Sequence, residues 1–402
     1  AIDRRGLLAY ARGRLPAYML PAVIEQLPAF PTTANGKIDR QALPALAIAD
    51  PDPTQSVIGP RDDIELDLVK IWEDVLQIRP IGVNDDYFEL GGQSLLAIQI
   101  MARIREQWGQ SIPLTQLFQD RTIESLSIAL RRRNAQPTHD ATIVLLQAGD
   151  ARKTPLFLVH PVGGTVFCYA DLLRHLDGRP CYGFQARGVD GPEEPFTQIE
   201  RMAHTYNLLL QEVQSRGPYQ IGGWSMGGVV ALEMAQQLQA QGKDVDSLVL
   251  IDAHFPADRD ARASDDAYLL RQFARHLGLP ARSRRQIPAG RDVAEMLLHV
   301  LHEARQANLV LPDFTPPQLA RRFAVFKANW RALAEYAPQQ YGGRVLLCVA
   351  EDNEPEEVAG IQRWPQVLKG EVETQYLPGD HFSLVREPDV RRLGAYLVEK
   401  LR

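Results

Sequence analysis

Three side chains that together perform nucleophilic catalysis occur in the second half of the sequence. Ser225 lies at the centre of residues 223–227, GWSMG, whose glycines allow the strained strand-to-helix turn that exposes a nucleophilic serine. A serine hydroxyl is a poor nucleophile at neutral pH unless a base accepts its proton and an acid orients that base. Asp252 and His381 follow Ser225 in the order acid, then base. We therefore predict acyl transfer through an ester on Ser225, with Asp252 and His381 completing a catalytic triad.

The elements expected around these residues favour the same assignment. The strand-to-helix turn at 223–227, which we call the elbow, follows an apolar strand at 219–222 and precedes a helix. The run 248–251 predicts a buried strand that ends at Asp252. Parallel strands that are consecutive in the chain usually lie side by side, so Asp252 should lie beside Ser225. His254 is a rival base, but it follows Asp252 by only two residues and is too close to reach back to the serine. We therefore expect His381 to be the base.

An acyl-transfer site also needs backbone donors for the oxyanion of the tetrahedral intermediate. Residues 160–164, HPVGG, follow an apolar strand at 156–159, and their glycines allow the amides to turn inward. We predict Val162 and Met226, the residue directly after the nucleophile, as the two oxyanion-hole donors. His160 comes before the serine in the chain, which favours a structural role for its side chain.

Strands and helices alternate through this part of the chain, which predicts an α/β fold with a mainly parallel sheet. The predicted strands are 156–159, 181–184, 219–221, 248–251 and 345–349. After Asp252 the alternation stops, and three amphipathic helices are predicted at 268–277, 293–307 and 319–336. We interpret residues 255–340 as a lid over Ser225, although a solvated helical decoration is the alternative. Phe323 and Phe326 are candidates for lining the cavity, but periodicity alone does not distinguish a cavity face from a core face.

A second serine stands in a different context. Ser94 follows Gly91-Gly92-Gln93 and opens a predicted helix, with further helical segments before and after it, so residues 61–133 are predicted to form a small helical bundle. A helix N-terminus favours an attached phosphate through its free N–H groups and the helix dipole. An ordinary N-cap serine is the alternative for this residue taken alone.

The longer run 85–96, DDYFELGGQSLL, closely resembles the phosphopantetheine attachment motif of peptidyl carrier proteins, and the resemblance covers the whole bundle. By this resemblance Ser94 would carry a covalent 4′-phosphopantetheine arm, attached by a phosphopantetheinyl transferase, whose thiol holds a peptide as a thioester. The loop at Tyr87-Phe88 would pack beneath the attachment site.

Residues 141–402 resemble the type I thioesterase domain that ends nonribosomal peptide synthetases, and a carrier directly before a thioesterase is the most specific feature of the sequence. Residues 15–21 and 35–40 resemble the last two motifs of adenylation domains, with Lys37 at the position that contacts carboxylate and phosphate. Because the ATP-binding core would lie upstream, Lys37 is not expected to function in this fragment. The resemblance implies a peptidyl substrate and, as partners, upstream condensation and adenylation domains of the same synthetase.

The positions of the linkers predict how the chain divides into domains. Two stretches rich in proline or polar residues divide the chain, which predicts a multidomain protein. The expected parts are an α+β adenylation remnant at 1–49, a linker at 50–60, a four-helix-type carrier at 61–133, a linker at 134–140 and an α/β-hydrolase thioesterase at 141–402.

The charge and the cysteines exclude several classes of function. The net charge of −6 gives no reason to expect a nucleic-acid partner, and no apolar run is long enough to span a membrane. The three cysteines are far apart and form no C-x-x-C pair, so we expect no metal site and no disulfide framework. Free thiols fit a cytoplasmic protein.

The predicted function is chain release in nonribosomal peptide biosynthesis. The peptide on Ser94 would pass to Ser225 and leave by hydrolysis or by macrocyclisation. Two alternatives remain open at this point: an editing hydrolase that clears stalled carriers, which the fused carrier disfavours, and a non-catalytic docking module, which an intact triad disfavours.

Overall fold

The structure of the 402-residue chain is a computed structural model. The structure describes residues 58–92, 94–110, 112–114, 116–133, 142–189, 193–256, 261–287, 292–307, 309–310 and 314–401. The predicted adenylation remnant, with Lys37, lies outside these residues.

The first described part is a small helical bundle. It contains α2 (Asp63–Leu76), α3 (Ser94–Trp108), α4 (Gln116–Gln119) and α5 (Ile123–Arg133). Asp62 caps α2 by accepting a hydrogen bond from the Glu65 amide, which satisfies one of the free N–H groups of the first turn. Leu68 and Trp72 of α2 pack against Ile100 of α3 and Leu126 of α5, and all four are fully buried. The apolar stripes predicted from helical periodicity therefore form the core of this bundle.

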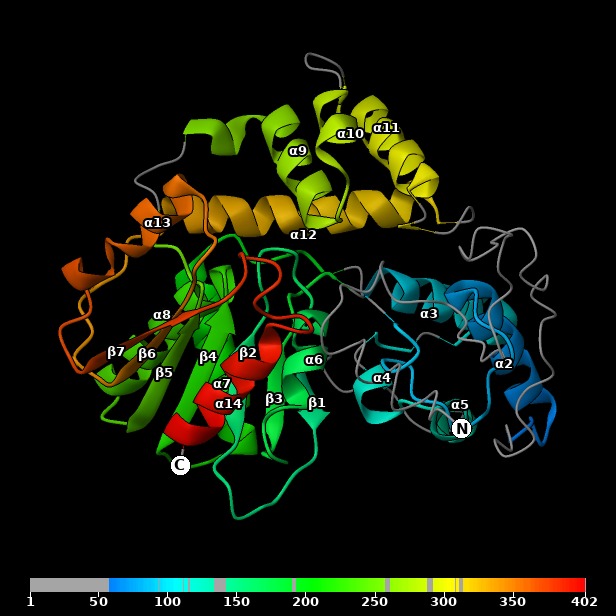
Figure 1. The fold of residues 1–402 in the computed structure, drawn as a ribbon, viewed down its shortest axis with the longest axis horizontal. Coiled ribbons are helices and arrows are strands. Elements are labelled where there is room, and N and C mark those ends of the chain that lie inside the picture. The colour runs from blue at the N-terminus through cyan, green and yellow to red at the C-terminus, as the bar shows by residue number, and fades with distance from the viewer. Residues whose placement is uncertain are drawn as a thin grey trace, which may run out of the picture. The chain divides into compact units, whose positions relative to one another are not determined.

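The second part is built on a seven-stranded sheet (Figure 1). The strands are β1 (Ile143–Gln147), β2 (Leu156–Val159), β3 (Cys181–Phe184), β4 (Tyr219–Trp224), β5 (Val245–Ile251), β6 (Val345–Ala350) and β7 (Val372–Leu377). Their order is β1-β3-β2-β4-β5-β6-β7, and every pairing is parallel except the antiparallel β1–β3 pair at one edge. The predicted mainly parallel α/β sheet is confirmed. The two edge strands, β1 and β7, were not predicted.

Helices cover both faces of the sheet because alternate strand residues point to opposite sides. Leu248 and Leu250 of β5 pack in one core with α7 (Ile199–Val213) and α8 (Met226–Ala240), while Val249 and Ile251 pack in the other. The second core also receives α6 (Ala170–Leu173) and α14 (Val390–Lys400). Short elements lie in the connections: η2 (Phe167–Tyr169), η3 (Ala261–Ser264), α13 (Pro355–Ile361) and η4 (Trp364–Gln366).

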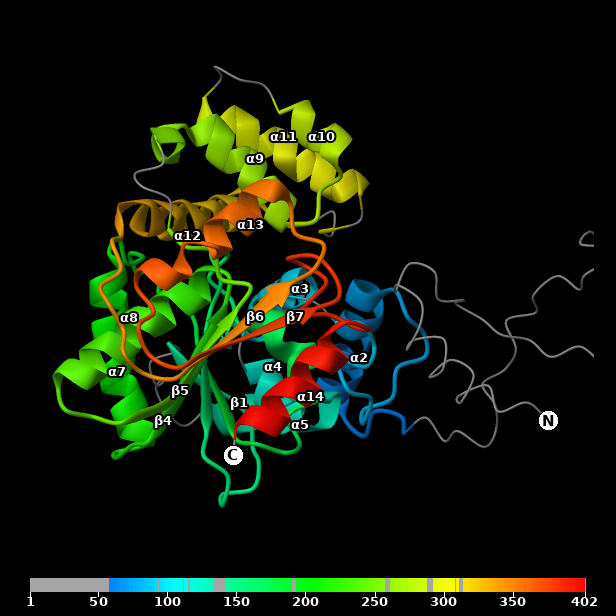
Figure 2. The same ribbon diagram turned by 60° about the vertical axis from the view of Figure 1, so that its left-hand side comes forward.

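The chain between β5 and β6 forms a separate helical layer, which we call the lid. It contains α9 (Asp266–His276), α10 (Ala281–Arg285), α11 (Val293–Gln306) and α12 (Pro316–Glu335). Figures 1 and 2 show α12 crossing above the strands, with α9 and α11 stacked on its outer side. The three predicted helices are present, and the short α10 is an addition to them.

One expectation for the lid was wrong. Phe323 and Phe326 were candidates for lining a cavity, but they are 3% and 1% exposed and belong to the core of the lid itself. Both rings pack on Phe273 of α9, with ring centroids 5.5 and 5.4 Å apart. They point into the lid because α9 and α11 cover that side of α12.

Among the helices in the described part of the chain, none is long and apolar enough to cross a bilayer.

Candidate active site

The elbow at Ser225 is formed by a strained backbone between β4 and α8. Ser225 has φ 59° and ψ −129°, and its amide donates a hydrogen bond to the carbonyl of Ile251 at 2.9 Å. The flanking glycines are required by close approach of the backbone. A Cβ on Gly223 would lie 2.3 Å from the carbonyl carbon of Gly227, and a Cβ on Gly227 would lie 2.3 Å from the carbonyl oxygen of Val159. The two glycines of the G-x-S-x-G pattern are therefore required because any larger side chain would clash with neighbouring backbone, as well as for the strained turn.

The structure brings Ser225, Asp252 and His381 together as one hydrogen-bonded chain. His381 Nδ1 lies 2.7 Å from Asp252 Oδ2, and His381 Nε2 lies 3.2 Å from Ser225 Oγ. A carboxylate only accepts, so Nδ1 carries the proton and Nε2 is left to accept the serine proton. The three residues come from loops after β4, β5 and β7, at the carboxyl ends of neighbouring or nearby strands. This geometry can activate a serine hydroxyl for attack on a carbonyl carbon.

Asp252 is held by partners that the sequence analysis did not identify. Its side chain is fully buried, and Oδ1 accepts hydrogen bonds from the Ala350 amide at 2.9 Å and from Asn353 Nδ2 at 2.7 Å. Burial alone would raise the pKa of the Asp252 carboxyl, but the adjacent imidazoles of His254 and His381 outweigh it and hold that pKa well below its usual range. The carboxylate is therefore ionised at neutral pH.

The rival base His254 lies beside His381 and approaches the same carboxylate oxygen of Asp252. Its Nε2 is 3.5 Å from Asp252 Oδ2, and its ring centroid is 4.9 Å from that of His381. The hydrogen bond to Ser225 comes from His381, so the structure favours His381 as the base. Ligand atoms of Asp252, His254 and His381 lie within 4.8 Å of one another, a spacing that a metal ion could also use. The triad hydrogen bonds already account for the positions of Asp252 and His381.

The ring of His381 is positioned by Trp224, the residue before Ser225. Trp224 Nε1 donates to the His381 carbonyl at 2.9 Å, and the two rings lie 5.0 Å apart between centroids. Phe382 contacts the same imidazole edge-on, with centroids 5.2 Å apart. Trp224 occupies the variable position of G-x-S-x-G, so no motif could have assigned it this role.

The loop after β2 lies against the elbow, since a Cβ on Gly227 of α8 would lie 2.9 Å from the carbonyl oxygen of His160. His160 is fully buried, its Nδ1 donates to the Pro161 carbonyl at 2.8 Å, and its Nε2 accepts from the Tyr206 hydroxyl at 2.9 Å. Burial lowers the pKa of His160 to about 4. His160 is thus a neutral structural residue of this loop. Val162, on the same loop, and Met226, the first residue of α8, stay predicted as oxyanion-hole donors.

The backbone around Ser94 fits a covalently attached phosphate ester. Ser94 is the first residue of α3, and Gly91 before it has φ +85°, a conformation suited to glycine. A Cβ on Gly92 would lie 2.3 Å from the ring of Tyr87, so the turn packs directly on that buried ring. A helix N-terminus reached through a tight, supported turn is a favourable place for an anionic group.

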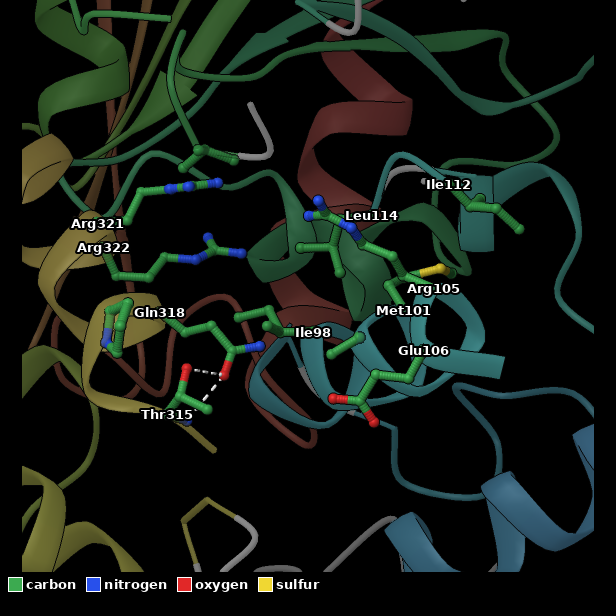
Figure 3. A pocket seen from close by; sticks show the side chains of 13 residues that line it. Ile98, Met101, Arg105, Glu106, Ile112, Leu114, Thr315, Gln318, Arg321 and Arg322 are labelled. Carbon is green, nitrogen blue, oxygen red and sulfur yellow. Dashed lines mark hydrogen bonds between the residues drawn. The ribbon is translucent and has the colours of Figure 1, made fainter. Parts of the chain in front are cut away.

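A pocket of about 460 Å³ is lined by residues of α3 and of α12 (Figure 3). From α3 come the apolar side chains Ile98 and Met101 and the cationic Arg105, and from α12 come the cationic Arg321 and Arg322. At the start of α12, the Thr315 hydroxyl and amide both donate to Gln318 Oε1 at 2.8 Å, which caps the helix beside the pocket. None of the triad residues lines this pocket, so it is not the catalytic cavity.

Comparison with known proteins assigns families to both described parts. Residues 154–393 match the Thioesterase domain family, and residues 67–130, which include Ser94, match the Phosphopantetheine attachment site family. A dimodular nonribosomal peptide synthase of Bacillus subtilis (strain 168) is 34% identical over 409 residues, covering 99% of this chain and 16% of that protein.

Solved structures give similar results. A four-domain nonribosomal peptide synthetase, holo-AB3403 bound to AMP and glycine, matches with a TM-score of 0.62 and 33% identity over 99% of this chain and 30% of its own. The NocB thioesterase domain, in covalent complex with a fluorophosphonate nocardicin G analogue, matches with a TM-score of 0.51 and 26% identity over 65% of this chain and all of its own. The chain thus spans less than a third of the multidomain relatives that match nearly all of it.

Proposed function

Because this chain belongs to the thioesterase domain family and carries a phosphopantetheine attachment domain ahead of the thioesterase, we propose that it releases peptides from a nonribosomal peptide synthetase. The observation that carries the proposal is the hydrogen-bonded chain Ser225–His381–Asp252, in the same polypeptide as a carrier domain. The relatives that match most of the chain are themselves nonribosomal peptide synthetases, which supports the same substrate class.

The triad would act in two half-reactions. In the first, His381 Nε2 accepts the Ser225 proton while Oγ attacks the thioester carbonyl, and the leaving thiolate is then protonated by the imidazolium. In the second, water or an internal amine or hydroxyl attacks the Ser225 ester, with His381 again as base. Asp252 stabilises the imidazolium in both steps, which its buried, ionised carboxylate suits. Val162 and Met226 would donate their amides to the oxyanion.

Ser94 is the residue proposed to hold the 4′-phosphopantetheine. When bound, that group supplies a flexible arm with a thiol for carrying an acyl chain as a thioester. The backbone of this chain contributes the helix N-terminus at Ser94 and the supported turn before it. Partners implied by the family are a phosphopantetheinyl transferase and upstream condensation and adenylation domains.

The experiment follows one acyl chain from carrier to product. A synthetic peptidyl-pantetheine is loaded on the carrier by a phosphopantetheinyl transferase, and carrier and product are followed by mass spectrometry. We expect free acid or a ring from the wild type and retained peptidyl carrier from Ser225→Ala. Ser215→Ala, a change at an exposed serine in the loop after α7, is the control and should release normally.

Labelling with a fluorophosphonate probe distinguishes an active serine hydrolase from a non-catalytic docking module. It should label Ser225 in the wild type and nothing at that position in Ser225→Ala. Release by Ser225→Ala at the wild-type rate would refute the proposed nucleophile. Preferential release of a mis-loaded acetyl group over the peptide would instead favour the editing hydrolase.

A further inference from the structure

His254 lies beside the triad, but the proposed reaction gives it no role. It follows Asp252 by two residues, in the loop after β5. Its Nε2 is buried, lies 3.5 Å from Asp252 Oδ2 and, within the described residues, has no hydrogen-bond partner. Buried polar atoms are nearly always paired, so an unpaired ring nitrogen next to a carboxylate oxygen is a position that a cation can share with that oxygen.

A second imidazole approaches the same oxygen. His381 Nδ1 is 2.7 Å from Asp252 Oδ2, and one donor atom from each of Asp252, His254 and His381 lies within 4.8 Å of the other two. The two imidazole rings lie 4.9 Å apart between centroids, with their planes inclined by 31°, and each presents one nitrogen to the carboxylate. Two imidazoles and a carboxylate are a common ligand set for zinc.

The spacing of these atoms is close to that of zinc ligands. Zinc binds nitrogen and oxygen at about 2.0–2.2 Å, so the ligands of a tetrahedral ion lie about 3.3–3.5 Å from one another. The two separations from Asp252 Oδ2 are 2.7 and 3.5 Å, and the separation of the two nitrogens is at most 4.8 Å. Movements of the imidazoles on the order of 1 Å therefore bring the three atoms to zinc-binding distances, with water as the fourth ligand.

The surroundings hold the carboxylate ready for an ion and leave a route to it. Asp252 Oδ1 accepts from the Ala350 amide and from Asn353 Nδ2, so Oδ2 is the oxygen left to face the imidazoles. Such supporting hydrogen bonds orient a ligand and raise its affinity for a metal. The side chain of His254 is 26% exposed and that of His381 is 10% exposed, so an ion can approach from the side of His254.

We propose that Asp252, His254 and His381 form an inhibitory site for Zn²⁺, which competes with the triad for two of its three side chains. The ion takes the lone pair of His381 Nδ1, and the proton of Nδ1 moves to Nε2, so the imidazole stays neutral. Nε2 then presents an N–H to Ser225 Oγ and no longer accepts the serine proton. The inhibition rests on the proposed role of His381 as base, whereas binding of the ion does not.

The ligand set also determines which cations inhibit. Imidazole nitrogens suit Zn²⁺, whereas Mg²⁺ and Ca²⁺ prefer a shell of oxygen atoms. The site contains no cysteine, so the spacing of the cysteines, from which we expected no metal site, does not bear on it.

The test variant is His254→Gln, which removes one zinc ligand and keeps all three residues of the triad. His175→Gln is the matched control, because His175 also has a side chain that is 26% exposed and lies 2.8 Å from a carboxylate, that of Glu387. If His254→Gln does not fold, His254→Phe, which keeps a ring against His381, carries the same expectations.

Inhibition is measured on the full chain with a peptidyl N-acetylcysteamine thioester. Free Zn²⁺ is set with a nitrilotriacetate buffer, and each rate is expressed relative to the rate of the same variant in excess chelator. We expect Zn²⁺ to inhibit the wild type and His175→Gln at the same free concentration, and Mg²⁺ at that concentration to leave both rates unchanged. His254→Gln should need at least about tenfold more Zn²⁺, because loss of even a supporting partner of a metal ligand costs about 10- to 100-fold in affinity.

Binding is measured separately from turnover, by calorimetric titration of Zn²⁺ into Ser225→Ala. Ser225 is not one of the three ligands, so this variant should keep the site. Adding His254→Gln to Ser225→Ala should weaken the tightest binding event by at least about tenfold, and adding His175→Gln should leave it unchanged.

Two results would overturn the inference. Equal inhibition of the wild type and of a folded His254 variant would show that the ion acts at another site. Equal affinity for Zn²⁺ in Ser225→Ala with and without the His254 change would show that His254 is not a ligand. Absence of turnover by the wild type in excess chelator would count against the proposed function instead, and the calorimetric titration would still test the zinc site.

Discussion

Stability at acid pH should depend on His160, which lies in the loop after β2 that carries the predicted donor Val162 and is not proposed to take part in catalysis. The imidazole is fully buried, and burial lowers its pKa from 6.5 to about 4. Below pH 6.5 the unfolded chain binds a proton at this histidine and the folded chain does not. The free energy of unfolding therefore falls as the pH drops from about 6.5 to about 4.

The size of the effect follows from the two pKa values. At pH 7.5 the imidazole is neutral in both states. At pH 5 the unfolded form is almost fully protonated and the folded form is only about one-tenth protonated, which lowers the free energy of unfolding by about 2 kcal/mol. Burial also lowers the pKa of His276, helped by the nearby charges of Arg386, His381 and Arg322, so the wild type should lose more than this single contribution.

Urea unfolding at pH 7.5 and pH 5 measures the effect. All three cysteines, Cys168, Cys181 and Cys348, lie in the thioesterase part, and the last two are buried in β3 and β6. Pulsed reaction with a dithiodipyridine, read by mass spectrometry, therefore reports the unfolding of this part alone. In the wild type the free energy of unfolding is lower at pH 5 than at pH 7.5. We expect this difference in free energy to be about 2 kcal/mol smaller in His160→Gln.

The matched control is His204→Gln, which removes an exposed imidazole from α7. An equal pH dependence in the wild type and in His160→Gln would refute the reasoning, because it would mean that His160 binds its proton equally in both states. If His160→Gln is less stable than the wild type by the same amount at pH 7.5 and at pH 5, the conclusion is the same.

Two further outcomes test the proposed residues. A phosphopantetheinyl transferase with coenzyme A should add one arm to the wild type and none to Ser94→Ala, as read by intact-protein mass spectrometry, and an arm on the variant would place the attachment site elsewhere. Asp252→Asn should stay folded, because Ala350 and Asn353 can still donate to the side-chain oxygen, yet lose up to about four orders of magnitude in kcat. Wild-type turnover by Asp252→Asn in a thioester assay would show that another group orients His381.

Local features of the chain were predictable because they depend on neighbours in sequence. The elbow needs glycines at 223 and 227, and both prove to be positions without room for a Cβ. The apolar periods of α2, α12 and β5 predicted elements whose buried faces form the cores. Hydrophobic periodicity indicates which face of a helix or strand is buried, and it can be read from a stretch of about ten residues.

The elements that were missed lack such a signal. β7 is an edge strand whose residues are mostly exposed or half-buried, so its polar sequence did not indicate a strand. α10 is five residues long and contains three arginines. Periodicity also left open which way Phe323 and Phe326 point, and only the position of α9 above α12 decided that they face the lid core.

The sequence by itself was enough to propose the nucleophile, the order of the triad and the carrier serine, because the two serines lie in short runs whose residue types follow from local backbone geometry. Only the tertiary structure decided that His381 rather than His254 makes the hydrogen bond to Ser225, a contact between residues 156 positions apart. It also decided that Asn353 holds Asp252 and that Asn329 donates to the Val162 carbonyl. The physical reason is that such contacts depend on how loops from different strands and lid helices pack together, and no periodic pattern along the chain encodes the partner of a single buried amide.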